Sequence, residues 1–247
     1  MKTLGVVAAL SAEARALGRA RRPEAGSLAW SNKLALLADG SMLAVSGIGG
    51  LAAAHAAATL IDAGVAALMT FGMAGGLDPT LAAGSVLLPA EVIALDGTRF
   101  ATARAWRERL SATLSARCGV MGGVLLTSDR SIDSSEAKGA AFRDTGAVAV
   151  DMESVFVARI AAHHQVPFIC VRVIVDTAAD ALPRAVVAAS RAGGVEIWRL
   201  LGGLISAPGD MAGLMRLARR YRSAMQALKL VARAGSFAPL ESEVHFA

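Results

Sequence analysis

Acidic side chains follow two strand-like runs in the middle of the chain. Met152 and Glu153 come directly after the run VAVD at 148–151, and Asp176 follows the apolar run Val166–Val175. In open α/β sheets, side chains at the carboxyl ends of strands face the ligand crevice. There a carboxylate can accept hydrogen bonds from sugar hydroxyls, and a protonated carboxyl can donate its proton to a leaving group. The two acids therefore suit acid-assisted bond cleavage in a sugar derivative.

A third acid and a buried arginine complete this set. Glu13 lies just inside a helical pattern that follows the first strand-like run. Arg172 lies within the apolar run VRVIV, where an unpaired guanidinium would be costly, so we expect it to pair with Asp176 or Glu153. The alternative is an edge-strand arginine whose head reaches solvent. Each acid taken singly could equally be a helix-terminus or capping residue, and only their joint placement indicates a site.

Two glycine-rich segments are expected to form turns beside these acids. The first, Gly47–Ala52, matches G-x-G-x-x-A, a fingerprint of dinucleotide-binding folds. That fold requires an acid after the next strand, but the next expected strand, Ala66–Phe71, ends without one. A dinucleotide-binding oxidoreductase remains an alternative on this motif alone. Since glycine lets a ligand approach the backbone closely, we expect ligand contacts at both segments, from Gly49 in the first and from Met73, Ala74 and Gly75 in the second, Gly72–Gly76.

Strand-like and helical patterns alternate along the chain. Strands are expected at Leu4–Ala9, Lys33–Leu37, Met42–Ser46, Ala66–Phe71, Ser85–Leu88, Glu91–Leu95, Gly123–Leu126, 148–150 and Val166–Val175. Helices are expected at Ala12–Arg19, Leu51–Ile61, Ala103–Ala116, Ser134–Arg143, Met152–His164, Ala185–Leu204 and Asp210–Val231. This alternation predicts an α/β fold with a mixed, mostly parallel central sheet flanked by helices.

The composition favours one large, well-buried domain. Of the 247 residues, 55% are hydrophobic and 18% are charged, and no linker divides the chain, so we expect a single domain over residues 1–247. The formal charge of +5 permits anionic partners. No compact Lys/Arg patch with interleaved aromatic residues is present in the sequence, and we expect no nucleic-acid partner.

Cysteine and histidine usage predicts neither a disulfide scaffold nor a metal site. Cys118 and Cys170 form no CxxC pair, and the four histidines show no metal-site spacing. The N-terminal run MKTLGVVAALSAEA is interpreted as a buried strand rather than a secretory signal, because its apolar part is short. Together these features favour a cytoplasmic protein.

The expected last helix, over 210–231, is both basic and amphipathic. Its apolar stripe comprises Leu214, Leu217, Tyr221, Met225 and Leu228, and its cations are Arg216, Arg219, Arg220, Arg222, Lys229 and, just beyond, Arg233. Such a helix either packs its stripe on its own domain or lies on an anionic membrane surface. Peripheral contact with the inner membrane surface is therefore an open alternative.

The motifs together resemble the family of nucleoside phosphorylases and methylthioadenosine–adenosylhomocysteine nucleosidases. The resemblance spans roughly Leu4 to Ala181 and is carried by GVVAALSAEARAL, VSGIGGLAAAHAA, GMAGGLDPTLAAGSVLLP, AVDMES and VPFICVRVIVD. It implies that Glu13 activates the attacking water, that Glu153 binds the ribose hydroxyls, and that Asp176 protonates purine N7. It also implies that Met152 packs against the sugar and that the enzyme is a homodimer without a cofactor.

Further positions of the resemblance concern the pocket wall. Ile48 and Ile132 match pocket-lining positions, and Arg172 matches an arginine that orients the acid site. Three positions depart from the nucleosidases: Met73 and Val175 stand in place of serines, and Ser131 stands where an aromatic residue stacks on the purine.

These departures shift the expected substrate. The segments FGMAGGLDP, AEAR and VDMES, with the basic last helix, are more similar to the hopanoid-associated branch of the family. That resemblance implies hydrolytic release of adenine from adenosylhopane, a lipid-bearing nucleoside. Phosphorolysis of the same bond stays open, because Arg15 near Glu13 suits a phosphate site. A methylthioadenosine or adenosylhomocysteine nucleosidase and a non-catalytic nucleoside- or lipid-binding protein are the remaining alternatives.

Overall fold

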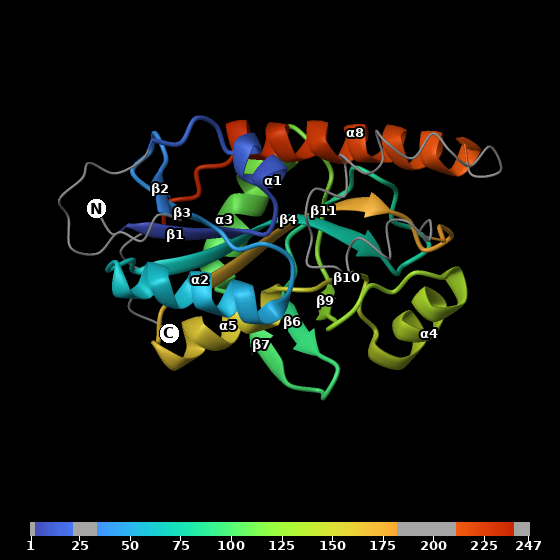
Figure 1. The fold of residues 1–247 in the computed structure, drawn as a ribbon, viewed down its shortest axis with the longest axis horizontal. Coiled ribbons are helices and arrows are strands. Elements are labelled where there is room, and N and C mark those ends of the chain that lie inside the picture. Colours follow the sequence, from blue (N-terminus) through green and yellow to red (C-terminus); the bar gives the residue numbers. More distant parts are fainter. Residues whose placement is uncertain (1–2, 22–33, 182–210, 240–247) are drawn as a thin grey trace.

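The computed structural model describes residues 3–21, 34–181 and 211–239, which form one α/β domain (Figure 1). The helix expected at Ala185–Leu204 lies outside the described residues. The strands are β1 Leu4–Ala8, β2 Leu34–Leu36, β3 Met42–Val45, β4 Ala67–Gly76, β5 Val86–Leu87, β6 Glu91–Ala94, β7 Arg99–Ala101, β8 Val120–Met121, β9 Val124–Thr127, β10 Ala149–Asp151 and β11 Phe168–Asp176. The helices are α1 Ser11–Ala16, α2 Gly50–Asp62, α3 Arg104–Ser115, α4 Ser135–Thr145, α5 Ser154–His163 and α8 Met211–Ala234.

All described strands join one mixed sheet whose centre is β4. The main path runs β2-β3-β1-β4-β10-β9-β6-β7, and β11 pairs with β4 and with β5, which in turn pairs with β8. Neighbouring strands are parallel in six pairs and antiparallel in four. The prediction of a mixed, mostly parallel sheet flanked by helices is confirmed. The antiparallel pairing of β10 with the end of β4 matters most for the site.

Helices cover the sheet on both faces (Figure 1). Helices α2 and α5 pack against each other and bury alanine and valine side chains in one core. Helices α1, α3 and α8 bury their apolar faces in a second core, which contains Trp106 and Phe71. Both cores are needed because the central strands are apolar on both faces, as the near-continuous hydrophobic runs predict.

Helix α8 is the basic helix expected over 210–231, and it continues three residues beyond that range. Leu217 and Leu228 of the predicted stripe are buried, together with Ala224 and Val231, whereas Tyr221 and Met225 are half-buried. The side chain of Leu214 lies outside the described residues. The stripe thus packs on the domain, and most of the basic residues face solvent. Among the described residues, no helix has the length and apolarity that crossing a membrane requires.

The second glycine segment is not a turn, which corrects the sequence-based expectation. Strand β4 continues from Ala67 through to Gly76, and none of its glycines has a positive φ. The segment stays extended because it has strand partners on both sides, β11 and β10. Tertiary pairing therefore overrides the turn tendency of Gly-Gly, and the small residues permit close approach of side chains from other strands.

Other boundaries differ by a few residues. Strands β7 and β8 are absent from the sequence-based expectation, and each is only two or three residues long. Helix α5 begins at Ser154, because Met152 and Glu153 form the connection from β10. By contrast, the expected turn at Gly47–Gly50 is present, with positive φ at Gly47 and Gly49.

Candidate active site

A cavity of about 190 Å³ opens where β1, β3, β4, β10 and β11 end or meet. Its wall also contains Ala9, Leu10, Arg130, Val150 and Asp151, which the sequence analysis had not assigned to the site. All predicted site residues line it except Gly49 and Arg172, namely Glu13, Ile48, Met73, Ala74, Gly75, Ser131, Ile132, Met152, Glu153, Val175 and Asp176. The three acids therefore share one cavity.

The acids reach this cavity from strands that run in opposite directions. Glu13 follows β1 and Asp176 ends β11, and both strands are parallel to β4. Glu153 follows β10, which runs antiparallel to β4 through the pairs Val150–Gly75 and Ala149–Gly76. The carboxyl ends of parallel strands, which the sequence-based expectation invoked, account for the positions of Glu13 and Asp176. The antiparallel pairing of β10 with the end of β4 accounts for the position of Glu153.

Glu13 is a buried carboxylate held by backbone amides. Its Oε1 accepts a hydrogen bond from Met73 N at 2.8 Å, and its Oε2 accepts one from Leu10 N at 2.9 Å. Burial raises the pKa of Glu13, whereas the Arg172 guanidinium and the backbone hydrogen bonds act against that rise. A Cβ at Gly72 would lie 2.6 Å from Oε1, so a glycine is required there for Glu13 to fit. Glu13 is thus oriented as a hydrogen-bond acceptor, as a general base must be.

Glu153 lies on the cavity wall and contacts the first glycine turn directly. Its Oε1 accepts a hydrogen bond from Gly49 N at 2.9 Å, and its Oε2 accepts a weaker one from Met152 N at 3.3 Å. Gly49 is the N-cap of α2 and has a φ of 107°, a conformation that favours glycine. Because a carboxylate of the chain itself occupies this amide, a dinucleotide phosphate would have to compete for it. This contact disfavours the dinucleotide alternative.

The environment of Glu153 also brings its pKa into the neutral range. Burial and the neighbouring Asp151 carboxylate raise the pKa of Glu153 to about 7, although Arg172 and the Gly49 amide act in the opposite direction. The folded protein therefore binds this proton more tightly than the unfolded chain does. Glu153 contributes stability that is fully present below pH 4.5 and is lost as the pH rises through about 7.

Replacing Glu153 by glutamine should consequently stabilise the protein at alkaline pH. A pKa rise from 4.5 to about 7 corresponds to at most about 3 kcal/mol, which the neutral amide would not lose. We expect Glu153→Gln to exceed the wild type in free energy of unfolding at pH 8 and to match it at pH 4, as measured by urea denaturation. An equal difference at both pH values would contradict the assignment.

Asp176 is buried at a bulge in β11. The pairing with β4 shifts register between Ile174 and Asp176, so that Asp176 lies opposite Gly75. A β-bulge breaks the alternation of side chains, and here it places both Val175 and Asp176 on the cavity wall. Burial raises the pKa of Asp176, whereas an ion pair with Lys138 opposes the rise.

Lys138 is the main functional candidate that the sequence analysis missed. It comes from α4, its side chain is fully buried, and its Nζ donates to Asp176 Oδ2. Within the expected helix, Lys138 lies three and four residues before Ala141 and Phe142, which pack on a core. This spacing puts the lysine on the apolar face of the helix, and a charge on that face is the signal that could have identified it.

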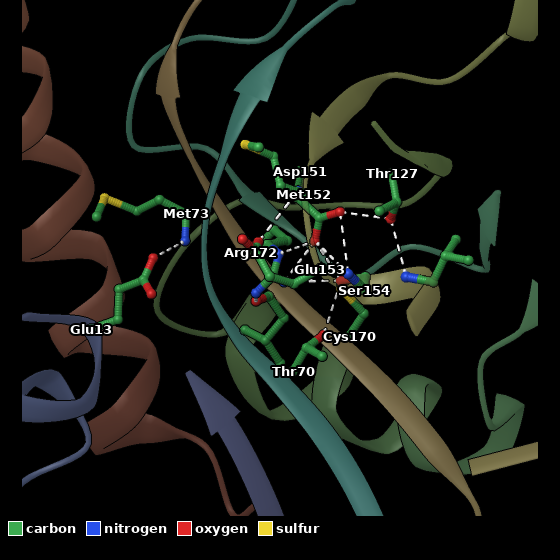
Figure 2. A network of polar contacts seen from close by, with 12 residues as sticks. Glu13, Thr70, Met73, Thr127, Asp151, Met152, Glu153, Ser154, Cys170 and Arg172 are labelled. Atoms are coloured by element: carbon green, nitrogen blue, oxygen red, sulfur yellow. Dashed lines mark hydrogen bonds and ion pairs between the residues drawn. The ribbon is translucent and has the colours of Figure 1, made fainter. Parts of the chain in front are cut away.

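Arg172 pairs with Asp151, not with Asp176 or Glu153 as the sequence analysis expected. Its Nε and Nη2 donate to Asp151 Oδ2 at 2.9 and 2.6 Å (Figure 2). The physical reason is the bulge in β11, which turns Asp176 away from the regular alternation that would place it on the face of Arg172. The expectation of a buried, paired arginine is correct, and only the partner is wrong.

Asp151 is the centre of a buried polar network next to Met152 and Glu153 (Figure 2). Its Oδ1 accepts a hydrogen bond from Thr127 Oγ1 at 2.7 Å, and its Oδ2 accepts one from the Ser154 hydroxyl. The network fixes the connection between β10 and α5, from which Glu153 reaches the cavity. Arg172 does not line the cavity. It acts on Glu153 indirectly, through its hydrogen bonds to Asp151 and Ser154 on either side of Met152 and Glu153.

Among the described residues, the rest of the wall is mainly apolar and includes one basic side chain. Ile48, Ile132 and Met152 supply apolar surface, and the Ser131 hydroxyl lies 4.0 Å from the Met152 sulfur. Arg130 is the basic residue on the wall and is exposed, whereas Arg15 is exposed but does not line the cavity. Within the described ranges, no group of three or more His, Cys, Asp and Glu residues could hold a metal ion.

Comparison with known proteins places these features in a family. Residues 3–194 match the family model described as "Phosphorylase superfamily". A search among curated proteins found no match.

Solved structures share the fold over almost the whole chain. The futalosine hydrolase of Helicobacter pylori superposes with a TM-score of 0.68 at 16% identity, covering 94% of this chain and 97% of that one. The 5′-methylthioadenosine/S-adenosylhomocysteine nucleosidase of Neisseria meningitidis, in complex with methylthio-immucillin-A, gives 0.65 at 21% identity, covering 93% and 98%. The corresponding nucleosidase of Helicobacter pylori, with butyl-thio-DADMe-immucillin-A, gives 0.67 at 17% identity, covering 94% and 98%. These likenesses show that the fold is that of the nucleosidases.

Proposed function

The chain belongs to the phosphorylase superfamily, whose members are enzymes that cleave N-glycosidic bonds, and we propose that it hydrolyses a purine nucleoside to release adenine. Glu153 binds the ribose hydroxyls, Glu13 activates the attacking water, and Asp176 protonates the departing purine at N7. Cleavage of a glycosidic bond passes through a state in which the sugar carries positive charge. Buried carboxylates around the sugar stabilise that charge, and protonation makes the purine a better leaving group.

The observation that carries this proposal is the convergence of three buried acids with different surroundings in one cavity. Glu13 is held by two backbone amides, Glu153 accepts from Gly49, and Asp176 pairs with Lys138. Different surroundings are what allow chemically identical groups to serve as base, sugar ligand and acid. A merely structural role would not require that all three line a largely apolar cavity.

Water is favoured over phosphate as the nucleophile. A phosphate site requires several cations or free amides, but Arg15 does not line the cavity and the amides of Leu10 and Met73 are occupied by Glu13. Arg130 is the specific feature that supports phosphorolysis as the second candidate, because it adds one cation to the wall.

A single assay separates these possibilities. Adenine release is measured from methylthioadenosine, adenosylhomocysteine and a lipid-linked adenosine, each with and without inorganic phosphate. Hydrolysis predicts release that does not depend on phosphate and a free sugar as the second product. Strict dependence on phosphate, with a sugar 1-phosphate as product, would replace hydrolysis by phosphorolysis. Tight nucleoside binding without any release would indicate a non-catalytic binding protein.

We also propose that the natural substrate carries a large apolar group, as in adenosylhopane. Met73, Val175 and Ser131, which differ from the nucleosidase pattern, all line the cavity. The apolar wall suits a hydrophobic substituent on the sugar. Among the three substrates of the assay, the lipid-linked adenosine should therefore have the highest kcat/KM, and a preference for methylthioadenosine would contradict this proposal.

Helix α8 supports a peripheral location at an anionic membrane surface. Residues 211–234 contain no Asp or Glu, and Arg216, Arg219, Arg222, Lys229 and Arg233 are exposed. Met215, on the same helix, is 55% exposed. Cations beside an exposed apolar side chain suit the interface of an anionic bilayer, which would also supply a lipid-bearing substrate.

Vesicle sedimentation tests this location. The wild type should bind vesicles that contain phosphatidylserine and should not bind vesicles of phosphatidylcholine alone. Replacing Arg216, Arg219 and Arg222 by serine should abolish binding and leave adenine release from a soluble nucleoside unchanged. Arg220 is kept, because it pairs with Asp180. A wild type that binds neither vesicle would remove the membrane proposal.

We further propose a homodimer, which sedimentation equilibrium would test.

A further inference from the structure

Lys138 is a buried lysine whose three ammonium hydrogens all have acceptors. Its Nζ donates to Asp176 Oδ2, to Thr177 O at 2.9 Å and to Asp180 O at 3.0 Å. Its side chain is 1% exposed, and that of Asp176 is 7% exposed. A neutral amine would carry only two hydrogens for these three acceptors, so the surroundings match the charged form.

The arrangement belongs to the segment that follows β11. Asp180 accepts hydrogen bonds from the Thr177 amide and hydroxyl, and Arg220 of α8 pairs with Asp180. Lys138 thus holds this segment from the side of α4, and Arg220 holds it from the side of α8. Of the two cations, Lys138 is the one that contacts the Asp176 carboxyl.

The ion pair creates a problem for the acid role of Asp176. A general acid must donate a proton, whereas a carboxylate paired with an ammonium has none to donate. The pair as a whole still holds one proton that can move, because a carboxylate beside an ammonium has the same proton count as a carboxylic acid beside an amine. The acid of this site is therefore better defined as the pair than as Asp176 alone.

We propose that Lys138 is a positioning residue that holds the carboxyl of Asp176 at the cavity wall and supplies the proton that Asp176 passes to the leaving purine. The inference rests on the proposed function. Asp176 remains the group that touches the substrate, and Lys138 acts through it. Both carboxyl oxygens lie 3.4 Å from the position of a Cβ on Gly75, so this glycine of the cavity wall leaves room for the carboxyl.

The proton balance of the step is complete. An N–H bond of Lys138 breaks as an O–H bond forms on Asp176, and that O–H bond breaks as an N–H bond forms on the purine. The electron pair of the glycosidic bond leaves with the purine, and the water oxygen bonds to the sugar carbon. Glu13 takes a proton from the water. The resting state returns when Glu13 releases its proton to solvent and Lys138 takes one up, so that hydrolysis consumes one water and no other reactant.

A leaving group that needs no proton provides the test. Adenine release from the best nucleoside substrate is compared with release of 4-nitrophenolate from 4-nitrophenyl riboside, which departs as a stable anion. The variants are Lys138→Met, Lys138→Gln, Asp176→Asn and the double variant Lys138→Met/Asp176→Asn. Glutamine retains hydrogen-bond donors but supplies no proton. Arg220→Met is the matched control, because it removes a cation that holds the same segment without contacting the Asp176 carboxyl.

We expect both Lys138 variants to lower kcat for the nucleoside at least about tenfold. The factor by which kcat falls for the nitrophenyl riboside should be at least about ten times smaller than the factor for the nucleoside. When Lys138→Met is added to Asp176→Asn, kcat for the nucleoside should fall by less than about a further threefold, because both residues act through one proton. Arg220→Met should leave the ratio of the two rates close to that of the wild type. If Lys138→Met does not fold, Lys138→Gln provides the comparison of the two leaving groups. The double variant removes both charges of the pair, so it leaves no unpaired charge and still allows the comparison with Asp176→Asn.

Other outcomes overturn the inference in distinguishable ways. Equal losses for both leaving groups, or independent losses in the double variant, would show that Lys138 only maintains the structure, while the proposed function would stand. A wild type that releases no base from any nucleoside would overturn the proposed function and this inference with it.

Discussion

Asp176→Asn is expected to lower kcat for purine release at least about 100-fold, since general acid assistance is typically worth about 10²–10⁴-fold. An amide retains the size of the carboxyl and its place at the bulge opposite Gly75. It can neither receive a proton from Lys138 nor deliver one to the base. Single-turnover measurements at saturating nucleoside would attribute the loss to the chemical step rather than to product release.

The same segment offers a matched control for this prediction. Asp180 lies four residues after Asp176 and does not line the cavity. Its carboxylate accepts a hydrogen bond from Thr177 N and forms an ion pair with Arg220. Asp180→Asn removes the same charge from the same segment, yet it should reduce kcat far less than Asp176→Asn does. Turnover of Asp176→Asn within about threefold of the wild type would end the assignment of Asp176 as the acid.

The largest effect on stability is expected for Arg172→Met. Removing one partner of a buried ion pair typically costs about 3–5 kcal/mol, because the remaining charge stays buried without compensation. Here the remaining charge is Asp151, which would keep hydrogen bonds from Thr127 and Ser154 but lose two from the guanidinium. Urea denaturation at pH 7 would measure the loss in free energy of unfolding.

A double-mutant cycle isolates the ion pair from simple packing. In Arg172→Met/Asp151→Asn both charges are absent, so the double variant should recover at least half of the stability that Arg172→Met loses. A loss below about 1 kcal/mol for Arg172→Met would show that Asp151 is compensated by other groups. A double variant as unstable as the sum of the two single variants would show that the two residues act independently.

Strand and helix patterns were the most reliable part of the sequence analysis. The apolar run Val166–Val175 predicted a fully buried strand, and β11 is buried along nearly its whole length. Its neighbours on both faces are helices, which is why a continuous rather than an alternating apolar pattern was present. The second glycine segment was interpreted wrongly as a turn, because local turn preference does not reveal that β10 and β11 pair with Gly72–Gly76.

The site shows the same division between local and long-range information. Glu13, Glu153 and Asp176 could be selected from their position after strand-like runs, and the cavity contains all three. The partners of the charges could not be selected in this way. Neither Asp151 nor Lys138 was assigned to the site, because each acquires its partner from another element of the chain.

The amino-acid sequence by itself determined the alternating elements, the apolar strands that need helices on both faces, and the acids at strand ends. These depend on side-chain type and periodicity, which are local properties of the chain. Only the tertiary structure decided that β10 runs antiparallel to β4, that a bulge re-aims Asp176, and that Lys138 rather than Arg172 is its cation. Those features follow from strand register and from the cost of leaving buried charges unpaired, and both are settled only when distant segments meet.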